Sequence, residues 1–290
     1  MNFWPKAKYL MSEITDLGFE VQDVTPGDGW HCSHFFYAFD RPALAKLKAE
    51  SPSILQTAKE EFISVLNSGD HRPARYQLGM TSGHKADFSL MLMDPDPIKV
   101  EAVHQRLLGT AMGQVLKTTW SYVSISEISE YALSVEQYGE RLKRQGEDPE
   151  SSAFQKKIAA YGGRVEKMNY QRLTPDFPDW PVSCFYPMNK WRLAGANWFS
   201  QAASERHRMM SQHARSGIKF AGKVTQLITV GIGLDDWEWG VTLWATNPKY
   251  LKDIVYEMRF DEASAKYAEF GPFYTSYIAS PQQVLEICRV

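Results

Sequence analysis

One succession of predicted elements occurs twice in this 290-residue chain, and this repetition constrains the fold more than any other feature. The clearest match is between G-H-K-A-D-F-S-L-M-L, which starts at Gly83, and G-L-D-D-W-E-W-G-V-T-L-W, which starts at Gly233. Each stretch is followed by a short break, Asp-Pro at 94–95 and Asn-Pro at 247–248. A proline after such a polar residue is typical of a helix start. We infer an internal duplication.

The hydrophobic periodicity predicts the same six elements in each copy. In the first copy the predicted strands are 31–39, 75–79, 86–93 and 119–128, and the predicted helices are 41–67 and 97–116. In the second copy the predicted strands are 183–190, 223–232, 238–245 and 273–279, and the predicted helices are 198–216 and 249–260. Both copies therefore have the order βαββαβ, which is ferredoxin-like. We expect an α+β protein with two tandem ferredoxin-like domains, whose sheets pack face to face or join into one barrel.

Two segments lie outside the repeat. Residues 1–25 form an N-terminal arm, and residues 132–180 connect the two copies. The connection is charged and punctuated by glycine at first and rich in proline at its end, which predicts a solvated helix and a loop. The predicted domains are therefore an N-terminal one at 26–131 and a C-terminal one at 181–290.

The composition excludes several classes of protein. A formal net charge of −2 gives no electrostatic basis for binding nucleic acid, and no apolar run approaches the roughly 20 residues of a membrane span. Cys32, Cys184 and Cys288 lack metal-site or redox-motif spacing, and the N-terminus lacks the pattern of a signal peptide. We therefore expect reduced thiols and a cytoplasmic protein.

The segment C-F-Y-P-M-N-K at 184–190 is the strongest candidate for function. Because side chains alternate along a strand, Tyr186, Met188 and Lys190 should share one face. The four residues from the phenol to the ammonium span roughly 13 Å, which is comparable to the width of a porphyrin. An oxidisable phenol beside a cation suits a flat, acidic, redox-active ligand. The same pattern also fits an ordinary edge strand with a core tyrosine and a surface lysine.

Two other polar residues stand on faces predicted to point inward. His213 shares a helical face with Met209 and Met210, so it is either a hydrogen-bonded core histidine or a ligand for haem iron. His207 is its rival, but it lies off that face. Gln226 lies on an otherwise apolar strand face, where its amide needs either a ligand or a neighbouring backbone group.

The 184–190 segment resembles the signature of the coproheme decarboxylases, a branch of the chlorite dismutase family. Further stretches agree with it in order and spacing: K-F-A-G-K-V-T-Q at 219–226, D-D-W-E-W-G-V-T-L at 235–243, V-Y-E-M-R-F-D-E at 255–262 and E-F-G-P-F at 269–273. The resemblance is nearly continuous from Arg172 to the C-terminus and weaker between Trp30 and Tyr131. It implies a barrel-like pair of domains, of which the C-terminal one holds the ligand. It also implies that hydrogen peroxide drives the decarboxylation of iron-coproporphyrin III (coproheme) to haem b through a tyrosyl radical.

The resemblance also gives roles to four of these residues. His213 would bind the iron, and Tyr186 would form the radical. Lys190 would pair with a second propionate or supply a proton. Gln226 would face the distal side of the iron, where chlorite-degrading members carry arginine. A neutral amide would not hold a charged oxychlorine ligand, which argues against chlorite dismutation.

Two further residues match propionate-binding positions of the family. Arg172 pairs well with a carboxylate, although a solvated loop charge is the ordinary reading of this segment. Ser264 matches a hydroxyl position that bonds a propionate, although serine is also a common helix cap. Arg259 either pairs with Asp261 or Glu262 or lines the rim of the site.

The resemblance also implies partners. Relatives form ring-shaped homopentamers, so we expect the same here, with a ferrochelatase as a candidate porphyrin donor. Two other classes of function stay open: a chlorite dismutase or haem peroxidase, and a non-catalytic protein that binds or transfers haem.

Overall fold

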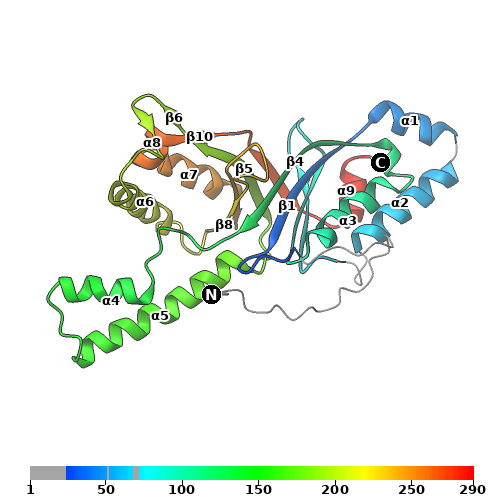
Figure 1. Ribbon diagram of the computed structural model, residues 1–290. Helices are drawn as coiled ribbons and strands as arrows, with labels where there is room; N and C mark the ends of the chain where they lie inside the picture. The colour runs from blue at the N-terminus through cyan, green and yellow to red at the C-terminus, as the bar shows by residue number, and fades with distance from the viewer. Residues whose placement is uncertain (1–23, 51, 68–71) are drawn as a thin grey trace, which may run out of the picture.

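A computed structural model describes residues 24–50, 52–67 and 72–290. Two halves of alternating strands and helices make up its body, and Figure 1 shows their helices at opposite ends of a central group of strands. The expected N-terminal arm lies almost wholly outside the described residues. Among the helices that the structure describes, none is long and apolar enough to cross a membrane.

The first half forms an antiparallel sheet in the order β4-β1-β3-β2. Its strands are β1 (His31–Phe39), β2 (Arg75–Thr81), β3 (Phe88–Asp94) and β4 (Leu116–Ser126). Its helices are α1 (Arg41–Glu50), α2 (Pro52–Asn67) and α3 (Pro97–Leu108), followed by the short η1 (Gly113–Val115). Asp96 directly follows the Asp-Pro break at 94–95 and caps α3 by accepting a hydrogen bond from the Ile98 amide, and Pro97 is the first residue of the helix.

The second half repeats this order as β11-β5-β9-β8. Its strands are β5 (Val182–Lys190), β8 (Val224–Val230), β9 (Trp239–Ala245) and β11 (Tyr274–Ile278). Its helices are α6 (Ala203–Ile218), α7 (Pro248–Met258) and α8 (Glu262–Tyr267), and the short strands β6 (Arg192–Leu193), β7 (Ala196–Asn197) and β10 (Ala268–Phe270) complete it. The βαββαβ order predicted for both halves is therefore confirmed.

The two sheets join edge to edge and close into one barrel. Strand β4 pairs with β8 at Ile125 and Val230, and β2 pairs with β11 from Gly79 to Thr81. Because both junctions are antiparallel and β5 also pairs with β9, the eight main strands form a closed ring. Closure leaves none of these eight described strands with an unpaired edge. Of the two packings left open by the sequence, the barrel is the observed one.

Aromatic side chains fill the inside of the barrel. Phe36 stacks on Tyr274 with ring centroids 4.0 Å apart, and Tyr122 and Phe185 lie 5.6 Å apart. The helices pack on the outer face of the sheets instead. In the first half that outer layer is closed, since Phe62 and Phe88 are fully buried between α2 and the sheet and Tyr37 hydrogen-bonds the His104 ring at 2.7 Å. The large cavity that the described residues form lies in the other half.

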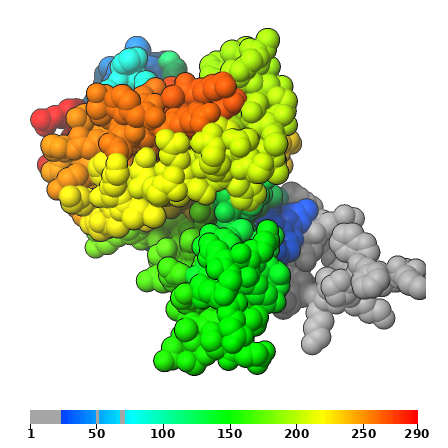
Figure 2. All heavy atoms as spheres, turned by 90° about the vertical axis from the view of Figure 1, so that its left-hand side faces the viewer, coloured from blue at the N-terminus to red at the C-terminus, as the bar shows by residue number. Residues whose placement is uncertain are grey.

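Several element boundaries differ from the prediction. The helix expected at 41–67 is two helices, because Pro52 lacks an amide hydrogen and starts a new one. The helix expected at 97–116 ends at Leu108, before Gly109 and η1. The connecting segment holds two helices rather than one, α4 (Val135–Arg144) and α5 (Ser152–Leu173). They form a hairpin that projects from the body, drawn in green below α6 and α8 in Figure 2.

The C-terminal helix α9 (Pro281–Ile287) crosses back to the first half. Val284 and Leu285 are buried there against the helices and sheet of the first half. The prediction of a domain at 181–290 stays untested as a folding unit, but this last helix contributes its apolar side chains to the core of the other half.

Candidate active site

The second half contains a cavity of about 470 Å³ between the outer face of its sheet and the helices that cover it. This volume is in the range of small-molecule and cofactor pockets. All six candidate residues from the sequence line it: Arg172, Tyr186, Lys190, His213, Gln226 and Ser264. They come from α5, β5, α6, β8 and α8, so the fold brings together residues up to 92 positions apart.

Strand β5 supplies one wall of the cavity. Tyr186, Met188 and Lys190 all line it, as the strand alternation predicts. The strand is not an edge strand, because β9 pairs along one side of it and β10 and β11 along the other. Both partners fix its register, so the spacing between the phenol and the ammonium is set by the sheet.

Tyr186 is almost fully enclosed by aromatic and aliphatic side chains. It is 6% exposed, it stacks on Phe273 at 4.5 Å between ring centroids, and it meets Phe270 at 5.8 Å. Burial raises the pKa of the phenol well above its ordinary value, and the positive charge of Arg259 opposes this only in part. The phenol therefore keeps its proton at neutral pH, so its oxidation must be coupled to loss of that proton.

Lys190 is buried at the end of β5. Its Nζ donates to the carbonyl of Ala263 at 3.2 Å and lies 4.3 Å from the ring centre of Trp198. Burial lowers the pKa of this lysine to about 8, although the carboxylates of Asp261 and Glu238 favour the charged form. An amine with such a pKa can both carry positive charge and release a proton near neutral pH.

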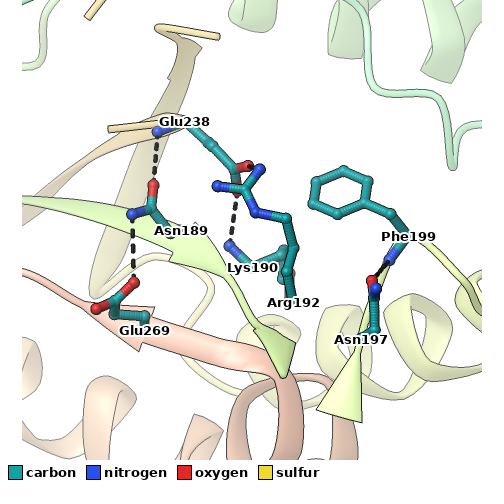
Figure 3. A network of polar contacts seen from close by, with 7 residues as sticks. All are labelled: Asn189, Lys190, Arg192, Asn197, Phe199, Glu238 and Glu269. Atoms are coloured by element: carbon teal, nitrogen blue, oxygen red, sulfur yellow. Dashed lines mark hydrogen bonds and ion pairs between the residues drawn. The ribbon is translucent and has the colours of Figure 1, made fainter. Parts of the chain in front are cut away.

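A buried carboxylate fixes the backbone at Lys190 (Figure 3). Glu238 Oε2 accepts a hydrogen bond from the Lys190 amide at 2.8 Å, and its Oε1 pairs with Arg192 at 2.7 Å. On the same strand end, Asn189 Oδ1 accepts from the Glu238 amide at 2.9 Å, and its Nδ2 donates to Glu269 at 3.3 Å. This network ties β5, β9 and β10 together where the lysine leaves the sheet.

Helix α6 supplies the opposite wall. His213 lies on its inward side, and Asp261 Oδ2 is 2.8 Å from its Nδ1. Ser264 Oγ lies 3.4 Å from the same nitrogen. An Nδ1 that donates to a carboxylate leaves Nε2 as the unprotonated nitrogen, which is the form that binds a metal. The rival His207 does not line the cavity, and its Nδ1 lies 2.9 Å from the Ala203 carbonyl.

Arg172 stands at the C-terminal end of α5, not in a solvated loop. Burial lowers the pKa of its guanidinium, and it forms no ion pair with any carboxylate in the described part of the chain. A desolvated cation without a partner is costly, and an anionic ligand in the cavity would remove that cost. Arg172 is therefore a cation that an anionic ligand in the cavity could pair with.

Gln226 and Ser264 complete the candidate set. Gln226 is exposed and lines the cavity beside Ile228, so its amide is not forced to bond to neighbouring backbone. Ser264 does not cap α8, because Asp261 does so by accepting from the Ser264 amide at 2.9 Å. Its hydroxyl is left to face the cavity and the His213 ring.

Sequence reasoning missed several groups at the site. Asp261 pairs with His213 and Glu262 pairs with Arg208, and among the described residues no ion pair joins Arg259 to either carboxylate. Arg259 is also not among the residues that line the cavity, so neither of its two alternatives is observed. Arg259 instead lies over the Phe270 ring at 4.6 Å. Helical spacing also predicts Arg206 on the inward face of α6 with His213, and Arg206 does line the cavity, although no role was predicted for it. Ser129, Glu130 and Tyr131 form part of the rim of the cavity, and no sequence pattern predicted that they would line it.

Comparisons with known proteins show the family to which this chain is similar. The model of the family "Chlorite dismutase" matches residues 55–279. A coproheme decarboxylase from Staphylococcus carnosus is 36% identical over 265 residues, covering 89% of this chain and 95% of the relative. One from Oceanobacillus iheyensis is 35% identical over 257 residues, covering 87% and 93%.

Two solved structures superpose on this chain over most of its length. A haem-binding protein from Thermus thermophilus superposes with a TM-score of 0.72 and 31% identity, covering 91% of this chain and 96% of that one. A mutant chlorite dismutase from Candidatus Nitrospira defluvii superposes with a TM-score of 0.66 over 91% and 98% of the two chains. At 13% identity, the second likeness concerns the fold alone.

Proposed function

The chain belongs to the chlorite dismutase family, and from this membership we propose that it decarboxylates iron-coproporphyrin III to haem b, with the iron porphyrin as substrate and hydrogen peroxide as oxidant. The cavity fits such a substrate on two independent counts. Its inward imidazole, His213, has Nδ1 held by Asp261 and so offers Nε2 to iron. Its desolvated Arg172, which has no ion pair among the described residues, needs an anion of the kind that a propionate supplies.

The reaction balances with one peroxide for each propionate. Converting a propionate to a vinyl group releases carbon dioxide, one proton and two electrons. Reduction of hydrogen peroxide to two waters consumes those two electrons and two protons. Hydrogen peroxide therefore supplies the oxidising equivalents, one further proton comes from solvent, and the residues of this chain would direct the oxidation to one carbon atom of the iron porphyrin.

Tyr186 is the residue that links oxidation to the propionate. Its buried phenol loses an electron and a proton together, and the resulting tyrosyl radical takes a hydrogen atom from the β-carbon of the propionate. Carbon dioxide then leaves and the remaining electron returns to the oxidised porphyrin. The phenol is regenerated, so the same residue can act on the second propionate through a monovinyl intermediate.

The other residues that line the cavity orient the porphyrin and supply a proton. Arg172 and Ser264 hold carboxylates, and Lys190 pairs with the second propionate or supplies a proton, to which its lowered pKa is suited. Gln226 lines the cavity, and on the distal side that the family resemblance gives it, a neutral amide leaves room for peroxide but does not retain a charged oxychlorine ligand. This last point separates the proposed reaction from chlorite dismutation.

The observation that carries the proposal is that His213 and Tyr186 line one cavity. The experiment is a titration of the iron-coproporphyrin III complex with hydrogen peroxide, followed by mass spectrometry of the porphyrin and measurement of carbon dioxide. Stepwise loss of two carboxyl groups is expected. If the porphyrin stays intact while chlorite yields oxygen, the protein is a chlorite dismutase. If neither reaction occurs and haem is bound and passed on, it is a carrier.

The proposal extends to the assembly of the protein, its porphyrin donor and its location in the cell. A homopentamer, a ferrochelatase as porphyrin donor and a cytoplasmic location follow from the family resemblance. The three free, buried cysteines suit a reducing compartment. Size-exclusion chromatography with light scattering tests the assembly.

A further inference from the structure

The lining of the cavity includes a third cation besides Arg172 and Lys190. Arg206 lies on α6, on the same inward side as Met210 and His213. Seven residues correspond to about two helical turns, or roughly 10.5 Å along the axis. If His213 held the iron of a porphyrin, Arg206 would stand about two helical turns from the centre of that macrocycle.

The surroundings of Arg206 leave most of its hydrogen-bonding capacity free. Its Nη1 donates to the carbonyl of Gln201 at 2.7 Å, and its guanidinium faces the phenol of Tyr131. It forms no ion pair with a carboxylate in the part of the chain that the structure describes. Glu130 hydrogen-bonds to Tyr131. Because a guanidinium has five donors, several remain for a ligand.

Arg206 and Tyr186 contact different groups of residues around the cavity. Tyr186 packs with Phe270 and Phe273 on the side of α7. Arg206 packs near Tyr131 at the start of α6, beside the chain segment that forms the rim. The two side chains therefore have different neighbours in the wall of the cavity.

Lys190 differs from Arg206 in the same way. The ring of Trp198 lies 4.3 Å from the Lys190 ammonium and meets the Tyr131 ring edge-on at 6.5 Å. Lys190 therefore contacts Trp198 whereas Arg206 contacts Tyr131, so the two cations have different neighbours in the wall of the cavity.

We infer that Arg206 binds one of the porphyrin carboxylates that are retained in the product. This deepens the proposed function, because it rests on a substrate with two carboxylates that react and two that do not. A cation on a retained carboxylate holds substrate, intermediate and product in one orientation, so that each reacting propionate meets Tyr186 in turn.

The test measures binding and not turnover. Iron-coproporphyrin III and haem b are titrated separately into the wild-type protein, Arg206→Gln and Arg206→Lys, and the Soret band is followed. Loss of a charge-assisted hydrogen bond costs about 1.5–3 kcal/mol, so Arg206→Gln should weaken both ligands by roughly 10- to 150-fold. Arg206→Lys should be intermediate, because a point charge replaces a fork of donors.

A matched control lies two residues further along the same helix. Arg208 pairs with Glu205 and Glu262 at the surface and does not line the cavity, so Arg208→Gln should leave both affinities unchanged. Unchanged affinities in Arg206→Gln would overturn the inference. Weaker binding of iron-coproporphyrin III alone would also overturn it, since the carboxylate concerned would then be one that is lost. If the wild type binds both porphyrins but releases no carbon dioxide, the proposed function fails while the binding result still stands.

Discussion

Asp261 holds two elements of the site at once: its Oδ2 lies 2.8 Å from His213 Nδ1, and its Oδ1 accepts from the Ser264 amide at 2.9 Å. The first contact orients the imidazole, and the second caps α8. Burial alone would raise the pKa of Asp261, but the hydrogen bonds from His213 and Ser264 outweigh it and the pKa is lowered. The carboxylate is thus ionised and keeps the Nδ1 proton of the imidazole in place.

Asp261→Asn should weaken iron coordination without unfolding α8. Asparagine is as good a helix cap as aspartate, but its amide can donate to Nδ1 and move the ring proton to Nε2. We expect about 10- to 100-fold weaker binding of iron-coproporphyrin III and a changed iron–imidazole stretching band in the resonance Raman spectrum. Asp253→Asn on the surface of α7 is the control. A wild-type spectrum in Asp261→Asn would contradict the orienting role.

Tyr186→Phe should abolish turnover while preserving binding. The ring packing on Phe273 is kept and only the hydroxyl is lost. We expect carbon dioxide release to fall at least about 100-fold, as when a group that takes part in the chemistry is removed. Affinity for iron-coproporphyrin III should change less than about threefold. Tyr274→Phe, inside the barrel, is the control. Substantial activity in Tyr186→Phe would rule out the tyrosyl radical.

The Lys190 ammonium should give the second decarboxylation a pH dependence. Its pKa is lowered to about 8, so the cationic form that binds a carboxylate is lost as the pH rises through that value. Conversion of the monovinyl intermediate should therefore slow above about pH 8, as followed by chromatography of the porphyrins at a series of pH values.

Two substitutions in the network of Figure 3 should move that profile in opposite directions. Glu238→Gln removes a negative charge that favours the ammonium, so the pKa of Lys190 and the profile should shift to lower pH. Arg192→Gln leaves Glu238 ionised without its cationic partner, so the shift should be to higher pH. Shifts of the same sign in both variants would mean that only the backbone geometry had changed.

Arg172→Gln should weaken substrate binding without destabilising the ligand-free protein. The guanidinium is desolvated and has no ion pair among the described residues, so its removal relieves a cost. We expect an unchanged or slightly higher melting temperature without ligand, and roughly 10- to 150-fold weaker binding of iron-coproporphyrin III. Arg164→Gln, exposed on the same helix, is the control. A drop in thermal stability confined to Arg172→Gln would show that the residue holds the fold.

Local patterns determined much of this protein in advance. Alternation along a strand placed Tyr186 and Lys190 on one face, and helical spacing placed His213 inward, because both depend only on residues close in the sequence. The duplicated βαββαβ order follows from the same periodicities. The prediction was weaker at 41–67 and in the connecting segment, where a proline and the packing of α4 on α5 decided how helices divide.

The tertiary structure alone decided how these pieces meet. Closure of two sheets into one barrel depends on β4 finding β8 and β2 finding β11, which are pairings between distant strands. The approach of Asp261 to His213 spans 48 residues and appears in no local pattern. The sequence could determine which face each side chain occupies, since backbone geometry fixes that. Only the tertiary structure determines which residue each side chain contacts across the core, since those contacts depend on how whole helices and strands pack together.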